Sequence, residues 1–131
     1  MPDFDSLARR FLPGGFLYEF QLEGVDFIQA HRGRALVADA MGVGKTIEAL
    51  GWSYRRPDLR PALIVCPAAV KLQWQREACK WLRIPPEDFA LLATRKPSSI
   101  ETPYACINYD VLNAWVPAIK AWGPKLVVLD E

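Results

Sequence analysis

The sequence has few of the side chains on which metal sites and disulfide frameworks depend. Its 131 residues contain one histidine, His31, and three cysteines, Cys66, Cys79 and Cys106, which are far apart and form no Cys-x-x-Cys pair. A structural zinc site needs about four such ligands at short spacing, so no zinc-binding domain is expected. An odd number of scattered cysteines indicates reduced, buried thiols in a reducing compartment.

Long hydrophobic runs and a strong net charge are also missing. The longest apolar run, residues 62–70, contains Pro67 and is far shorter than the roughly 20 residues that a membrane-spanning helix needs. The N-terminus has no basic segment followed by an apolar stretch, so no secretory signal is expected. The formal net charge of +1 gives no overall field that would attract nucleic acid or an anionic membrane, and no membrane partner is expected.

The remaining composition is typical of a globular domain. Hydrophobic residues make up 51% and charged residues 24% of the chain, which excludes a disordered tail, a collagen and a coiled coil. A chain of 131 residues is long enough for one small domain with a hydrophobic core, but too short for a complete two-lobed motor. No internal repeat or low-complexity tract is present, and the first 13 residues show no clear periodicity.

Segments with helical periodicity alternate with short apolar segments that are typical of strands. Apolar positions at helical spacing predict helices over residues 21–31, 45–54, 69–82 and 110–122, the last with a break at Pro117. Continuous apolar runs predict strands over residues 34–38, 62–66, 89–93, 104–107 and 125–129. Unalternating strands separated by helices indicate an α/β fold, with a mostly parallel sheet covered by helices on both faces.

The helix expected over residues 69–82 has two distinct sides. An apolar stripe should face the core, and we favour that interpretation over a platform for stacking bases; its members are Val70, Trp74, Ala78 and Trp81. A basic side is either a solvated surface, which we favour, or a contact for nucleic acid; its members are Arg76, Lys80 and Arg83.

The clearest chemical motif is Gly-Val-Gly-Lys-Thr at residues 42–46, between the strand expected over 34–38 and the helix expected over 45–54. Glycines let a backbone approach a phosphate closely, and the N–H groups of the turn and of the helix N-terminus form an anion site. In such a phosphate loop (Walker A), Lys45 would bind the β- and γ-phosphates and the Thr46 hydroxyl would bind Mg²⁺. The general pattern has a glycine where this sequence has Asp39, and the alternative is a helix N-terminus with glycine-assisted packing.

A second half of a nucleotide site is expected after the strand over residues 125–129. Asp130 and Glu131 follow that strand directly. The first carboxylate would hold Mg²⁺, and the second would act as a general base on the attacking water. Acidic residues often follow strands in solvated turns, so this pair is informative only together with the upstream phosphate loop.

These segments together resemble the Swi/Snf-type group of the superfamily-two helicase-like ATPases, over residues 17–131, and within it the annealing-helicase-like branch. The Asp-x-Met-Gly-x-Gly-Lys-Thr form of residues 39–46 is similar to motif I of that group and explains Asp39. The other similar segments are residues 20–25 (the glutamine motif), 63–67 and 73–77 (motif Ia and its helix), 108–112 (after the next strand) and 130–131 (the start of the Asp-Glu-x-His box of motif II).

The resemblance implies ATP and Mg²⁺ as cofactors and assigns a role to each matching residue. Gln21 would read the edge of adenine, with a polar residue at a helix start as the alternative, and Phe20 would pack either against the base or in the core. Thr46 and Asp130 would bind the metal, Glu131 and Lys45 would serve catalysis, and Pro67 and Lys71 would lie at the nucleic-acid backbone. The nucleotide would be bound by Gln21, Met41, Gly42, Val43, Gly44, Lys45 and Thr46.

The resemblance also implies a P-loop NTPase fold of the RecA-like type, in which residues 1–16 are an N-terminal extension and 17–131 a truncated ATP-binding lobe. The family couples ATP hydrolysis to movement along double-stranded DNA, so the expected partners are duplex DNA and a second lobe that carries arginine fingers. The parent protein would be an ATP hydrolase, in the cytoplasm of a bacterial or phage-infected cell or in a eukaryotic nucleus.

The chain ends before the expected His of motif II and before motif III, whose strand is central in such sheets. We therefore expect weak ATP binding, little turnover, and a homodimer formed by strand exchange. Two other functions stay open. One is a different superfamily-two member, an RNA helicase or a restriction-type translocase, and the other is a catalytically inactive nucleotide-binding or interaction module.

Overall fold

The computed structural model describes residues 11–30 and 45–130. The helices and strands in these ranges are β1 (Phe11–Leu12), β2 (Gly15–Phe16), α2 (Glu19–Ala30), α3 (Lys45–Arg55), β3 (Ala62–Cys66), α4 (Lys71–Leu82), β4 (Phe89–Leu92), β5 (Tyr104–Asn108), α5 (Leu112–Trp122) and β6 (Leu126–Leu129). The strand expected over 34–38, together with His31, Met41, Gly42, Val43, Gly44 and Glu131, lies outside the described residues. None of the helices in the described ranges has the length and hydrophobicity that crossing a membrane requires.

The main sheet has four parallel strands in the order β4-β5-β3-β6. This confirms the expected α/β fold with a parallel sheet. Every residue of β3 and β5 is buried, which explains why both strands are continuous apolar runs in the sequence. The strand boundaries agree with the expected ones to within one residue.

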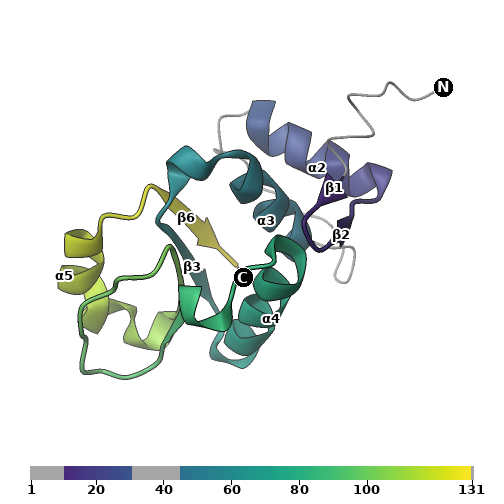
Figure 1. Cartoon of the computed structure of the whole chain (residues 1–131). Coiled ribbons are helices and arrows are strands. Elements are labelled where there is room, and N and C mark those ends of the chain that lie inside the picture. Colours follow the sequence, from purple (N-terminus) through teal and green to yellow (C-terminus); the bar gives the residue numbers. More distant parts are fainter. Residues whose placement is uncertain (1–10, 31–44, 131) are drawn as a thin grey trace.

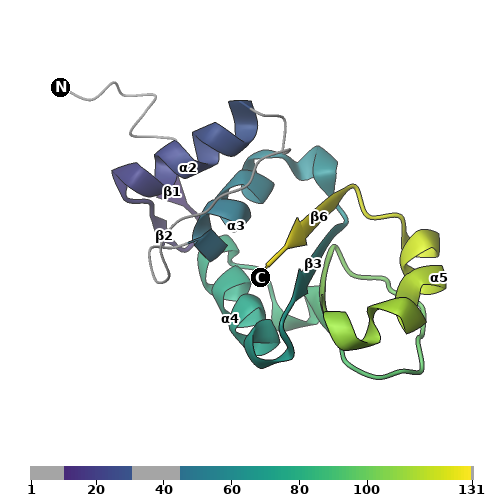
Figure 2. The same ribbon diagram turned by 180° about the vertical axis from the view of Figure 1, so that it is seen from behind.

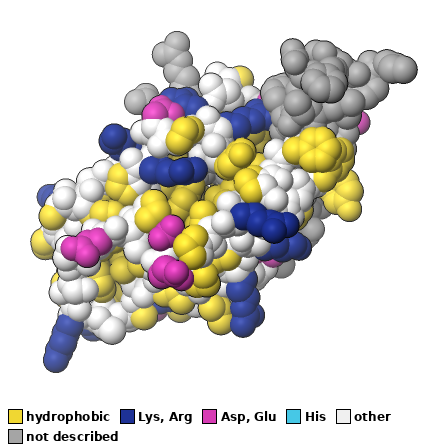
Figure 3. Space-filling view, in the orientation of Figure 1, with side chains coloured by type: hydrophobic (Ala, Val, Ile, Leu, Met, Phe, Trp, Pro, Cys, Tyr) yellow, Lys and Arg dark blue, Asp and Glu magenta, His cyan; other side chains and the backbone are white. Residues whose placement is uncertain are grey.

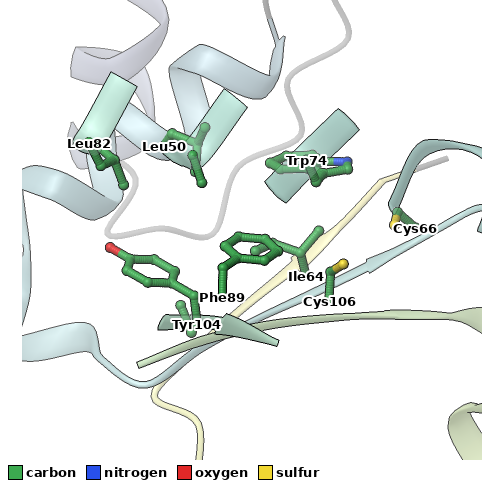
Figure 4. Packing of buried hydrophobic residues seen from close by; sticks show 10 residues of the cluster. Leu50, Ile64, Cys66, Trp74, Leu82, Phe89, Tyr104 and Cys106 are labelled. Carbon is green, nitrogen blue, oxygen red and sulfur yellow. The ribbon is translucent and has the colours of Figure 1, made fainter. Parts of the chain in front are cut away.

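Helices cover both faces of this sheet, α3 and α4 on one side and α5 on the other (Figures 1 and 2). Alternate residues of β3 serve the two sides, so that Ile64 packs toward α4 and Leu63 toward α5. The cluster beneath α4 is drawn in Figure 4 and consists of Leu50, Ala62, Ile64, Cys66, Trp74, Ala78, Leu82, Phe89, Tyr104 and Cys106. Trp74 and Ala78 of the expected apolar stripe are therefore core residues, while Arg76, Lys80 and Arg83 are exposed as expected of a solvated side.

Helix α2 packs against α3. A separate hydrophobic cluster joins the two helices, with Val25 and Ile28 on α2 and Ile47 and Trp52 on α3. Two polar contacts reinforce the pair: Trp52 Nε1 donates to Gln29 Oε1 at 2.8 Å, and Arg55 forms a 2.9 Å ion pair with Asp26. The position of α2, which carries Gln21, is therefore set by the helix that begins with Lys45 and Thr46.

A short hairpin precedes α2, where the sequence indicated no regular structure. Strands β1 and β2 pair antiparallel across Pro13 and Gly14, and the Gly14 N–H donates to the Trp81 carbonyl at 2.9 Å. A Cβ on Gly14 would collide with the backbone carbonyl of Lys80, so this close approach requires glycine. Part of the segment assigned to an N-terminal extension thus packs against the end of α4.

Helix α5 is continuous through Pro117, so the expected break at that residue is wrong. Proline removes the N–H that would bond the carbonyl of Asn113. Both Asn113 and Pro117 lie on the exposed side of α5, where water can bond that carbonyl. On the other side, Trp115 is buried against the sheet and holds the helix in place despite the missing bond.

Candidate functional site

The residues that the sequence linked to chemistry gather at one edge of the sheet. Because the strands are parallel, their carboxyl ends meet there, and Pro67, Asn108 and Asp130 mark the ends of β3, β5 and β6. Lys71 opens α4 at the same edge. Ligands of open α/β sheets bind outside the carboxyl ends of the strands, so this edge is the candidate site.

Asp130 is fixed at this edge by contacts from three elements. Its N–H donates to the Val65 carbonyl of β3 at 2.8 Å, and its carbonyl accepts from the Tyr109 hydroxyl at 2.8 Å. Its carboxylate oxygen Oδ2 accepts from Trp74 Nε1 of α4 at 2.9 Å. Both the backbone and the carboxylate of Asp130 are therefore oriented by the fold.

Lys71 joins the ends of two strands. Its ammonium donates to Asn108 Oδ1 at 2.9 Å and to the carbonyl of Leu92 at 3.2 Å. An ammonium has three donors, so two of them are engaged within the chain. The contact with a nucleic-acid backbone that the sequence suggested for Lys71, and for Pro67 before it, stays a prediction.

The thiol of Cys66 is influenced by both charges of this edge. Burial raises the pKa of the Cys66 thiol, and the negative charge of Asp130 raises it further, while the Lys71 ammonium lowers it. Both charged groups thus act on one buried atom at the end of β3. The edge combines a carboxylate, a cation and a neutral thiol within interaction range.

Gln21 caps the start of α2. Its Oε1 accepts from the Tyr18 N–H at 2.8 Å, which satisfies a backbone donor that the first helical turn leaves without a partner. This is the polar helix-start role that the sequence left as the alternative to reading adenine. A carbonyl oxygen has two lone pairs and the amide has two N–H donors, so the cap leaves bonding capacity for a base.

Phe20 is not a core aromatic. Its side chain is 48% exposed and stacks on Tyr18, with ring centroids 5.9 Å apart. The pair of rings stands beside Gln21 at the start of α2. This exposure leaves the flat face of an aromatic ring next to the residue expected to read a base.

Lys45 and Thr46 form the first turn of α3, as the phosphate-loop motif requires. The glycines that precede them, and Glu131 after Asp130, lie outside the described residues. The structure thus places the helical half of the phosphate motif and the first acid of the Asp-Glu pair, and it brings Asp130, Pro67 and Lys71 to one edge.

The side chains of Asp130 and Thr46 carry oxygen donors of the kind that magnesium prefers when it is bound together with phosphate. Within residues 11–30 and 45–130, no three His, Cys, Asp or Glu side chains form a metal-binding group. Mg²⁺ commonly takes one or two carboxylates and completes its octahedron with water and phosphate oxygens. Asp130 Oδ2 is bonded to Trp74, and among the described residues no hydrogen bond reaches Oδ1.

Sequence reasoning missed Trp74 as a neighbour of the site. Its helical spacing assigned it correctly to the core, but spacing says nothing about the direction of an indole N–H. Asn108 and Tyr109 were noticed only as part of a family-like segment. The signal that marks them is their position at the carboxyl end of β5, with Asn108 as its last residue and Tyr109 directly after it.

Comparisons with known proteins agree with this fold. A family model described as the SNF2-related domain matches residues 20–112. The chain is 36% identical over 117 residues to the SWI/SNF-related matrix-associated actin-dependent regulator of chromatin subfamily A-like protein 1 of Bos taurus, covering 88% of this chain and 12% of that protein. It is 32% identical over 136 residues to the DNA annealing helicase and endonuclease ZRANB3 of Homo sapiens, covering 97% of this chain and again 12% of the relative.

A solved structure shows the same fold. The SWI2/SNF2 ATPase core of Sulfolobus solfataricus, solved in complex with dsDNA, aligns with a TM-score of 0.66 and 17% identity, over 92% of this chain and 33% of that one. The expected resemblance is confirmed, and the match to the annealing helicase agrees with the expected branch. The chain belongs to the SNF2-related domain family of helicase-like ATPases.

Proposed function

We propose that this chain is the ATP-binding part of a translocase that acts on double-stranded DNA. Family membership supports an ATP-dependent, helicase-like function. The observation that carries the proposal is the placement of Asp130 at the candidate edge of the sheet. Its backbone is bonded to Val65 and Tyr109, and its carboxylate accepts a hydrogen bond from Trp74. A carboxylate fixed in this way is ready to receive a cation without reorganisation.

ATP is the proposed ligand, bound with Mg²⁺. The backbone of residues 41–44, with Lys45 and Thr46, would hold the phosphates at the start of α3. Thr46 and Asp130 would hold the metal, which supplies charge neutralisation to the phosphates, and Glu131 would activate water. Gln21 would bond the adenine from the start of α2, with Phe20 beside it.

Duplex DNA is the proposed partner. The Sulfolobus relative was solved with dsDNA, and this likeness supports the assignment. The charge pattern adds little, because Figure 3 shows Lys and Arg side chains dispersed among apolar and acidic ones on the face that it presents. Efficient turnover would need arginine fingers from a second lobe, so little hydrolysis is expected of this chain alone.

Calorimetric titration with ADP in the presence of Mg²⁺ tests the nucleotide assignment. Wild type should bind, and Lys45→Ala should bind at least tenfold more weakly, because the ammonium meets phosphate charge. Lys120→Ala, which removes an exposed lysine from α5, is the matched control and should bind as wild type does. A wild-type chain that binds no nucleotide would favour an interaction module without nucleotide.

Binding of duplex DNA, duplex RNA and single-stranded DNA by fluorescence anisotropy tests the partner. The proposal expects tighter binding to duplex DNA than to the other two. Tighter binding to RNA would favour an RNA helicase instead. Salt dependence should be measured in each case, because phosphate contacts dominate such affinities.

A further inference from the structure

We propose that Trp74 is a positioning residue for the magnesium-binding carboxylate of Asp130. The inference rests on the proposed function, since it assumes that Asp130 meets a metal-bound nucleotide. The inference goes beyond the proposed function because it assigns a role in metal binding to a core tryptophan of α4. The two residues are 56 positions apart in the sequence and are joined by a 2.9 Å hydrogen bond from Nε1 to Oδ2.

The indole ring is held rigidly. Trp74 is 4% exposed and packs in the cluster beneath α4 with Ile64, Cys66 and Cys106 (Figure 4). In that view its nitrogen lies on the side of the ring toward Cys66, at the carboxyl end of β3. A ring buried to this degree in a close-packed cluster cannot swing away, so its N–H fixes the position of the oxygen it meets.

The backbone of Asp130 is already fixed before the side chain is considered. Its N–H bonds to Val65 and its carbonyl to Tyr109, each at 2.8 Å. Rotation of the side chain is then the freedom that remains, and the bond from Trp74 to Oδ2 restricts it. The other oxygen, Oδ1, would then be the one that binds the metal.

The other tryptophans of the described chain show that the direction of this N–H is specific. Trp115 and Trp122 donate to loop carbonyls, of Thr94 and Thr102. Trp52 donates to Gln29 Oε1 on α2, and Trp81 donates to Glu77 one turn away on the same helix. None of those four bonds reaches a group at the carboxyl ends of the β3 and β6 strands. The Trp74 bond instead reaches the carboxylate at the ligand-binding edge, and hydrogen bonds to ligating carboxylates commonly change metal affinity by about 10–100-fold.

A double-mutant cycle tests the inference. The dissociation constant of ADP is measured by calorimetry, with Mg²⁺ and with EDTA, for wild type, Trp74→Phe, Asp130→Asn and the double variant. The ratio of the two constants is the magnesium enhancement. Phenylalanine keeps most of the packing and removes the N–H, so W74F should lower the enhancement by about tenfold and leave the EDTA affinity unchanged.

Trp81→Phe is the matched control. It removes an indole N–H that also bonds a carboxylate on α4, at 2.8 Å, but the acceptor is Glu77. This variant should keep the wild-type enhancement. In the Asp130→Asn background, W74F should have no further effect on the enhancement, because the positioned charge is already gone.

The outcomes separate the two proposals. A wild type without magnesium-enhanced binding overturns the proposed function and the role of Trp74 with it. An enhancement that depends on Asp130 but survives W74F overturns the positioning role alone, and so does a W74F variant that weakens binding equally in EDTA.

A second measurement needs no change at Trp74 and covers the case in which W74F does not fold. In NMR spectra, D130N should move the indole N–H resonance of Trp74 and leave that of Trp115 in place. An unmoved Trp74 resonance would overturn the inference.

Discussion

Gly24 of α2 lies directly over the buried carboxyl group of Glu48 on α3. A Cβ built on Gly24 would be 2.6 Å from Glu48 Oε1 and 2.7 Å from Oε2, closer than any real Cβ contact. Glu48 is only 1% exposed, so its side chain has little room to move. The glycine in the middle of α2 therefore allows the close approach of the helix that carries Gln21 to the helix that carries Thr46.

Gly24→Ala should destabilise the chain. Alanine is favoured over glycine in a helix by about 1 kcal/mol, but the collision with Glu48 should outweigh that gain and lower the free energy of unfolding by about 1–2 kcal/mol. Urea denaturation followed by circular dichroism measures this difference.

The sign should reverse in the Glu48→Ala background. There the added methyl group meets no carboxyl group, and helix propensity alone predicts that Gly24→Ala stabilises by up to about 1 kcal/mol. Gly51→Ala is a milder comparison, because its Cβ would be 3.2 Å from Val25 Cγ2. Equal effects of Gly24→Ala in both backgrounds would contradict the steric explanation.

Cys106 should make the chain less stable at alkaline pH. Burial, and next the neighbouring Cys66, raise the pKa of the Cys106 thiol from 9.0 to about 12. Above pH 9 the thiol ionises in the unfolded chain while it stays neutral in the folded one. The neutral thiol therefore makes its full contribution to the free energy of unfolding below pH 9. Between pH 9 and about 12 that contribution falls by about 1.4 kcal/mol per pH unit.

Comparison with Cys106→Ala isolates this effect. The free energy of unfolding is measured in urea with a reducing agent at pH 7.5 and 10 for both chains. Wild type should lose more stability over this interval than the variant, because all other groups titrate in both. Parallel losses would show that Cys106 does not carry the effect.

Pro117→Ala should stabilise the chain. Alanine restores the N–H that can bond the Asn113 carbonyl, and the site is exposed, so no cavity or collision results. The expected gain is about 1–3 kcal/mol, reduced somewhat because proline also restricts the unfolded chain. Thermal unfolding measures it, and Pro124→Ala, beyond the Gly123 cap, should change little. A loss of stability in Pro117→Ala would contradict the prediction.

Strand β6 should promote self-association. It is one of the two edge strands of the sheet in the described residues, the other being β4. Val127 and Leu129 of β6 are 51% and 69% exposed on the face that α5 covers elsewhere. Apolar edges of this kind invite pairing with another chain, which agrees with the expected homodimer. Sedimentation velocity should show a concentration-dependent dimer.

Leu129→Lys should shift that equilibrium toward the monomer, because a charge on an edge strand opposes pairing. Leu72→Lys, at an exposed leucine of α4, is the control and should leave it unchanged. A wild-type chain that stays monomeric at every concentration would count against the strand-exchange dimer.

The parallel sheet was predictable because its central strands are buried on both faces. Residues 62–66 are apolar without interruption, and such a run is typical of a strand that is buried on both faces of a parallel sheet. The hairpin β1–β2 was not predictable in the same way, because two-residue strands have no measurable periodicity. Its stability depends on Trp81 at the end of α4, far along the chain.

The residues of the candidate site likewise divide into those that the sequence predicted and those that only the structure placed. Asp130 and Thr46 were recognisable because each belongs to a short motif beside a strand or helix. Gln21 was predicted to contact a base, which stays a prediction, while the cap on Tyr18 that the structure shows was only the alternative. Trp74 was assigned to the core and not to the site, since its partner lies in another element.

The amino-acid sequence alone thus specified the helices and strands of the main sheet, the phosphate-loop motif and the residue types at the edge of the sheet. Folding added the strand order β4-β5-β3-β6, the packing of Glu48 under Gly24 and the bond between Trp74 and Asp130. The physical reason is the range of the interactions. Hydrophobic periodicity and helix or strand propensity depend on residues that are close together in the sequence. Strand pairing and the partner of a buried N–H depend on segments that come into contact only when the chain folds.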